Sequence, residues 1–90
     1  MVTIAFVHNR FPAGGAERIT IDIARYLRSI GGYRVYVYAT RVNQMLMTEE
    51  LDEILTIRHI PSQAIQASRS AAVEKLIEID DVDILVQVGK

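Results

Sequence analysis

A glycine pair, Gly14-Gly15, separates two stretches of different pattern near the start of this 90-residue chain. Residues 3–8 form a continuous apolar run bounded by turn residues, which predicts a strand covered on both faces, as in a parallel sheet. Residues 16–30 carry apolar side chains at helical spacing, and Gly31-Gly32 marks the end of that helix. A glycine turn from a strand into a helix lets the backbone approach a ligand and directs free helix amides toward it. This turn is therefore the first candidate for a ligand site.

Three further strands and a second helix are predicted downstream. Residues 34–40 alternate small aliphatic side chains with an arginine and two tyrosines, which predicts a strand. Residues 55–60 also alternate, between Leu55, Ile57, His59 and Thr56, Arg58, Ile60, and the polar positions of this second strand favour a sheet edge. Residues 44–53, between them, fit one or two helical turns. Residues 63–79 place apolar side chains near one stripe, with Ser62 as a candidate N-cap, and residues 83–88 predict a fourth strand.

This order of elements predicts the fold class. Strand, helix, strand, short link, strand, helix, strand is the pattern of a doubly wound, Rossmann-like half in the α/β class. Right-handed crossovers favour a four-stranded, mainly parallel sheet in the order 3-2-1-4 with two long helices. Because ninety residues make one domain at most, we expect residues 1–90 to form a single, partial Rossmann-like domain.

Composition excludes several classes of function. Half of the residues are hydrophobic and 23% are charged, which predicts a packed core rather than disorder. The net charge is −1 and the ten basic residues are scattered, so we expect no nucleic-acid partner. The chain has no cysteine and therefore no disulfide or thiolate metal site. It has neither a basic leader with a cleavage site nor a long apolar run, so we expect a cytoplasmic protein.

The predicted strand order places the glycine turn at the ligand crevice. In such sheets ligands bind outside the carboxyl ends of the strands where the order reverses, here between the first and fourth strands. His8 ends the first strand beside the turn, so it could face an acceptor hydroxyl or simply cap the core. Arg10 would be a loop cation that adds charge-assisted contacts to a phosphate, unless it is only solvated.

Other readings of the turn are weaker or remain open. A dinucleotide fingerprint needs G-x-G-x-x-G and an acid after the second strand, whereas this chain has only Gly14-Gly15 and then Thr40-Arg41. A Walker A loop needs Gly-Lys-Ser/Thr, which is absent. The alternative that stays open is a small non-catalytic binding or interaction module in which the glycine turn is purely structural.

An acidic motif, Asp81-Val82-Asp83, spells D-x-D, a spacing that can hold a metal ion together with a diphosphate. It precedes the fourth strand, so it falls at the amino edge of the sheet, opposite the crevice. We predict solvated carboxylates at a helix-to-strand turn, with Asp80 in the same cluster, and no metal site.

Four segments in the first forty residues resemble the start of the GT-B glycosyltransferases of family 4. These are Ile-Ala-Phe-Val-His, Pro-Ala-Gly-Gly-Ala-Glu-Arg, Ile-Ala-Arg-Tyr-Leu and Tyr-Arg-Val-Tyr-Val-Tyr-Ala-Thr. In that family the Gly-Gly-x-Glu loop lines the cleft between two Rossmann-like domains, near the nucleotide-sugar diphosphate and the acceptor. The resemblance implies that Gly14 and Gly15, with Ala16 beside them, donate backbone N–H groups, and that Glu17 lies in the first turn of the helix.

The resemblance also implies what the whole protein does. The full-length parent would transfer a sugar from a nucleotide-sugar, its donor substrate, to a glycan or lipid-linked acceptor, and could be membrane-peripheral. The family's E-x7-E glutamate pair and its donor-clamping basic residues lie in a C-terminal domain, and no glutamate here has another eight positions on. We therefore expect an acceptor-side fragment with no catalytic residue or cofactor of its own, inactive alone. Because its fourth strand has no following helix, we also expect self-association through that strand.

Overall fold

The strands form a four-stranded, all-parallel sheet in the order β3-β2-β1-β4, which confirms the predicted α/β class and strand order. The computed structural model describes residues 1–12, 14–61 and 71–88. The strands are β1 (Val2–Phe11), β2 (Tyr33–Val42), β3 (Thr56–His59) and β4 (Ile84–Gln87). The helices are α1 (Gly15–Ile30), α2 (Glu49–Ile54), α4 (Ala71–Ile79) and a 3-10 turn, η1 (Gln44–Leu46).

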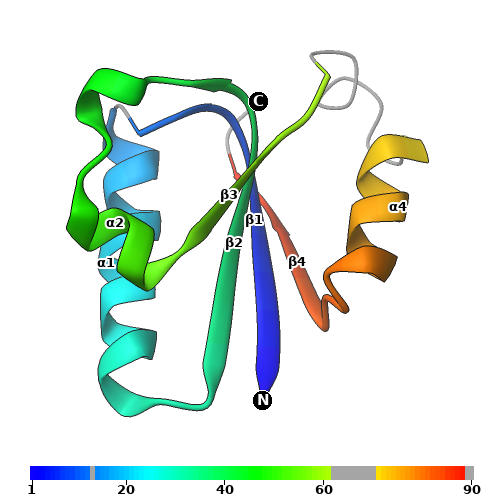
Figure 1. Cartoon of the computed structure of the whole chain (residues 1–90), viewed down its shortest axis with the longest axis horizontal. Helices are drawn as coiled ribbons and strands as arrows, with labels where there is room; N and C mark the ends of the chain where they lie inside the picture. Colours follow the sequence, from blue (N-terminus) through cyan, green and yellow to red (C-terminus); the bar gives the residue numbers. More distant parts are fainter. Residues whose placement is uncertain (13, 62–70, 89–90) are drawn as a thin grey trace.

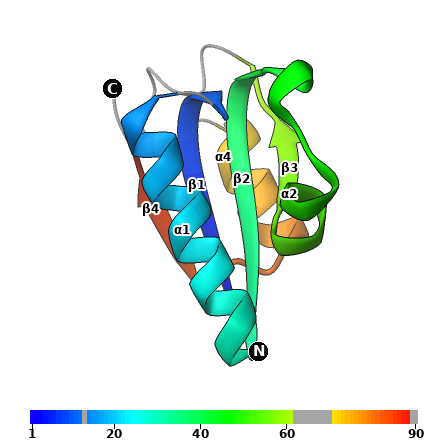
Figure 2. The ribbon, with the colours of Figure 1, turned by 90° about the vertical axis from the view of Figure 1, so that its left-hand side faces the viewer.

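Helices cover both faces of the sheet, with α1 and α2 on one face and α4 on the other (Figure 1; Figure 2). β4, the strand that follows β3 in the chain, lies at the other edge of the sheet. A right-handed connection between these two strands crosses the face opposite α1, which is where α4 lies (Figure 1). β3 lies at an edge, as its polar positions predict. The predicted N-cap Ser62 and residues 63–70 of the predicted second helix lie outside the described residues.

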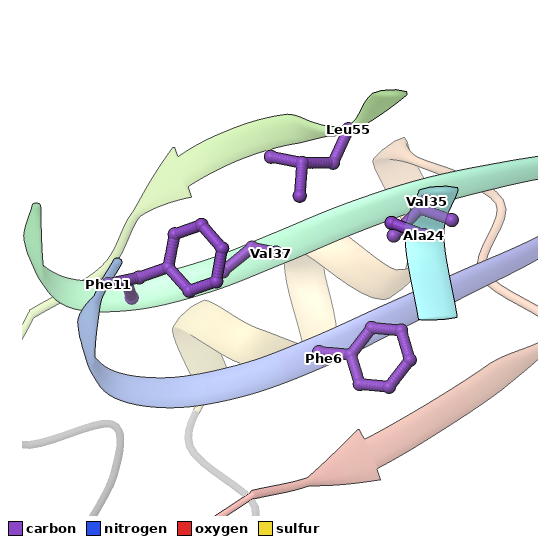
Figure 3. Packing of buried hydrophobic residues seen from close by; sticks show 7 residues of the cluster. Phe6, Phe11, Ala24, Val35, Val37 and Leu55 are labelled. Atoms are coloured by element: carbon purple, nitrogen blue, oxygen red, sulfur yellow. The ribbon is translucent and has the colours of Figure 1, made fainter. Parts of the chain in front are cut away.

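Two apolar clusters, one on each face, make up the core. The cluster on the α1 face gathers Phe6, Phe11, Ala24, Val35, Val37, Ala39 and Leu55, most of which Figure 3 labels. The cluster on the α4 face gathers Ala5, Val7, Tyr36, Tyr38, Ile60 and Val73. Successive residues of β2 enter opposite clusters, because side chains alternate along a strand. Tyr36 and Tyr38 therefore lie on the same face of β2.

A buried carboxylate ties the α4 face together and corrects one prediction. Asp80, at the end of α4, has a side chain only 1% exposed, so it is not a solvated member of an acidic cluster. Its Oδ2 accepts a hydrogen bond from the Tyr38 hydroxyl (2.8 Å), and its Oδ1 accepts one from Arg58 Nη2 (2.7 Å). Sequence spacing could not reveal this, since Asp80 follows a helix and both partners lie on strands far away in the chain, Tyr38 on β2 and Arg58 on β3. Asp81 and Asp83 are exposed and precede β4, as expected, but Asp83 Oδ2 also accepts a hydrogen bond from Thr3 N of β1 (2.8 Å) and is not simply solvated.

The orientation of α1 also differs from the prediction. Its buried residues are Thr20 and Ala24, whereas Ile19, Ile23 and Ile30, expected on the apolar stripe, are exposed, Ile19 by 62%. The polar side of α1 is held against α2, because Arg25 pairs with Glu50 at 2.9 Å. The opposite side of the helix is left uncovered. We call Ile19, Ile23, Tyr26 and Ile30, together with the 48% exposed Ile84 of β4, the apolar flank.

Replacing the buried carboxylate should destabilise the fold. Asp80→Asn removes the charge that Arg58 and Tyr38 contact, and we expect the free energy of unfolding to fall by about 2 kcal/mol, measured by urea denaturation. The matched control is Asp81→Asn, an exposed residue with φ of 55°, a conformation that asparagine tolerates. Its effect should stay below about 0.5 kcal/mol. Equal losses in both variants would contradict the assigned role of Asp80.

Candidate functional site

The glycine turn joins the carboxyl end of β1 to α1. Gly14 is the N-cap of α1 and has a φ of +86°, a conformation that other L-residues rarely adopt. A Cβ at this position would also lie 3.4 Å from Glu17 Oε2. Gly15 begins the helix, and a Cβ there would meet nothing within 4 Å. The first glycine is therefore required by the backbone, whereas the second leaves open space above the turn.

The amides at the start of α1 have no partner among the described residues. There, the first intrahelical bond runs from Arg18 N to Gly14 O (3.3 Å), and the N–H groups of Gly15, Ala16 and Glu17 precede it. The Glu17 carboxylate folds back toward Gly14, where the positive end of the helix dipole favours a negative charge. The turn thus offers donors and one acceptor group side by side. This combination suits hydroxyl groups, while Glu17 opposes the approach of a phosphate.

His8 lies beneath the turn rather than on its surface. It is 2% exposed, its Nε2 is 2.8 Å from Thr20 Oγ1, and its ring stacks at a tilt on Phe11. Because the Thr20 hydroxyl also reaches the carbonyl of Ala16 (3.4 Å), the imidazole helps to position the first turn of α1. Burial lowers the pKa of His8, and the charge of Glu17 partly opposes this effect. A direct ligand contact by His8 stays a prediction.

Arg10 is not in a loop as predicted, because β1 continues to Phe11. The pairing between β1 and β2 extends to Phe11↔Val42, which is why the strand outlasts its apolar run. The Arg10 side chain is exposed at the carboxyl edge of the sheet.

A groove of 360 Å³ lies beside the turn. One wall consists of the turn and α1, and includes Gly14, Glu17 and Arg18. The other wall comes from the segment after β2 and includes Leu46 and Thr48. Sequence reasoning missed this second wall, although one signal was available. The segment follows β2, and neighbouring parallel strands end at the same edge of a sheet.

The comparisons with known proteins add no identification: no protein-family model, curated protein or solved structure matches the chain. Within residues 1–12, 14–61 and 71–88, no three His, Cys, Asp or Glu side chains are grouped so that they could hold a metal ion. None of the helices in the described part of the chain has the length and apolarity needed to cross a bilayer.

Burial of His8 should make stability depend on pH. Its folded pKa lies below the usual 6.5, so the stabilisation by the neutral ring is present above 6.5 and is lost as the pH falls through the lowered value. We expect the urea midpoint to fall between about pH 7.5 and about pH 5.5, on either side of the ordinary histidine range. His8→Asn should flatten this dependence. His59→Asn, which replaces the other, exposed histidine, should leave it unchanged, and the reverse pattern would contradict the assignment.

Proposed function

We propose that the chain is the acceptor-side part of a GT-B glycosyltransferase of family 4, and that the Gly14-Gly15 turn forms one wall of its substrate cleft. The observation that carries the proposal is the position of the turn. The first three amides of α1, which have no partner among the described residues, lie at the carboxyl end of β1, where the strand order of a parallel sheet reverses. A groove opens on the β2 side of them, between α1 and the segment after β2. The resemblance of the first forty residues to that family supports the same assignment.

The chemistry of the groove favours a sugar acceptor on this side. Glu17 offers carboxylate oxygens to hydroxyl groups, and Arg18 and Thr48 add polar groups along the walls. Ile21 and Leu46 line the same groove and would pack against the apolar C–H faces of a sugar ring. The groove is also lined by Asp22, Arg25 and Glu50, which pair with one another, so its lining mixes charged and apolar side chains.

The nucleotide-sugar would be held mainly by a second, C-terminal domain of the parent protein. The diphosphate would approach the free amides from that side, and the glycan or lipid-linked acceptor would lie in the groove. On this proposal the ninety residues supply binding and orientation but do not catalyse transfer by themselves. The donor is a substrate, so no resident cofactor is involved.

One observation favours the alternative of a non-catalytic binding module. Glu17 already places a negative charge beside Gly14, at the end of the helix that a phosphate would need. If the carboxylate keeps that place, the turn is structural and the groove binds only neutral groups.

Amide chemical shifts separate the two candidates. Addition of a nucleoside diphosphate at millimolar level should move the amide signals of Gly14, Gly15 and Ala16. Gly14→Ala should abolish this response, because it strains the turn. Gly32→Ala is the matched control, since Gly32 also has a positive φ but lies beyond the other end of α1. If the three signals do not move, the turn does not face a phosphate, and the non-catalytic binding module becomes the better-supported proposal.

The apolar flank provides a separate proposal about partners. Parallel sheets are normally covered on both faces, and β4 is an open edge of this one. In a larger protein further βα units would cover the flank. For the chain by itself, we expect a second copy to do so.

Sedimentation velocity over a range of concentrations tests this. The sedimentation coefficient should rise with concentration, and Ile84→Lys or Ile23→Lys should suppress the rise by placing a charge on the flank. Met45→Lys, at a residue 93% exposed on η1 and outside the flank, should not. A coefficient that is independent of concentration would count against self-association.

A further inference from the structure

Two arginines stand next to each other at the carboxyl edge of the sheet. Arg10 of β1 and Arg41 of β2 are register partners, and neighbouring strands lie about 4.8 Å apart. Both side chains are exposed, whereas the residues that follow them, Phe11 and Val42, pack into the cluster on the α1 face. The two guanidinium groups therefore lie outside the core, next to each other at the same edge of the sheet.

This arrangement is unfavourable for the protein alone. Like charges directly opposite each other on neighbouring strands repel. Within the described part of the chain, neither arginine has an ion pair or hydrogen bond from its side chain. By contrast, Arg25 pairs with Glu50 and Arg58 with Asp80, so carboxylates are used to neutralise arginines elsewhere in this fold. The two charges at the carboxyl edge, by comparison, have no carboxylate partner among the described residues.

The strands beneath the pair are fixed. The Thr40 hydroxyl bonds the backbone carbonyl of Asn9 and lies 3.0 Å from Asn9 Oδ1, which joins β1 to β2 one residue before each arginine. Asn43 N donates to Phe11 O (2.8 Å) just after them. The exposed carboxylates Asp81 and Asp83 lie at the opposite, amino edge and do not compete. The pair is therefore held in register on a rigid base.

We infer that Arg10 and Arg41 together bind a phosphate group, best a phosphomonoester dianion. Each guanidinium presents several N–H donors in a planar fork that fits phosphate oxygens, and two of them balance two negative charges. The inference rests on the proposed function in one respect only, namely that the bound phosphate would then be a group of the acceptor molecule. Phosphate binding by the pair is independent of the amides of the glycine turn. Two sources share this chemistry, a soluble sugar phosphate and the headgroup of a lipid.

Thermal melting and titration in the presence of glycerol 3-phosphate test the inference. The ligand should raise the melting temperature of the wild-type chain, because it binds only the folded state. Arg10→Gln and Arg41→Gln should each weaken binding about tenfold, the usual cost of losing a charge-assisted hydrogen bond. Without ligand, neither variant should be less stable than wild type, since each removes a repulsion. Arg34→Gln, at an exposed arginine near the amino end of β2, is the matched control and should bind as wild type.

Vesicles containing phosphatidic acid, compared with vesicles of a neutral lipid, distinguish the two sources. Binding to the acidic vesicles that depends on Arg10 and Arg41 indicates a lipid headgroup, whereas binding to glycerol 3-phosphate alone indicates a soluble acceptor. The inference is overturned if the Arg10 and Arg41 variants bind both probes like wild type, or if Arg34→Gln weakens binding equally. Its failure would leave the amide shifts of the glycine turn unaffected, so it is distinguishable from failure of the proposed function.

Discussion

The pairing of β1 with β2 is the constraint on which the rest of the structure depends. The two strands stay in register from Val2↔Tyr33 to Phe11↔Val42, the longest pairing of the sheet. β1 also carries β4, and β2 carries β3, so both shorter strands are added to this central pair. At the carboxyl end the same pairing aligns the glycine turn with the segment after β2, and thereby creates the groove. The candidate site is a consequence of this register.

Elements governed by local pattern could be predicted from the sequence. The four strands, the long α1 helix and the strand order follow from apolar runs, from glycine positions and from the handedness of crossovers. The placement of the glycine turn at the carboxyl edge follows from the same pattern. These features depend on residues close together in the chain.

Features governed by distant contacts could not be predicted. α1 turns Thr20, Ala24 and Leu27 to the sheet, where Thr20 meets His8 of β1, so an apolar stripe alone could not say which isoleucines would be buried. Asp80 looks like one of several surface acids until Tyr38 and Arg58 are brought to it by other strands. The extension of β1 through Arg10 depends on β2 continuing beside it. In each case a partner many residues away decides the outcome.

The buried network of Asp80 and the contact of Asp83 have a consequence for how freely this sequence can vary. Asp83 Oδ2 accepts a hydrogen bond from Thr3 N (2.8 Å), so β4 is tied to the start of β1 at the amino edge. The polar contacts that secure α4 and β4 thus lie away from the crevice. Within the described part of the chain, the side chains of Arg10, Arg41 and Arg18, at or near the carboxyl edge, make no contact of this kind. Substitutions there should leave the framework stable, so residues around the candidate site can vary while the fold is kept.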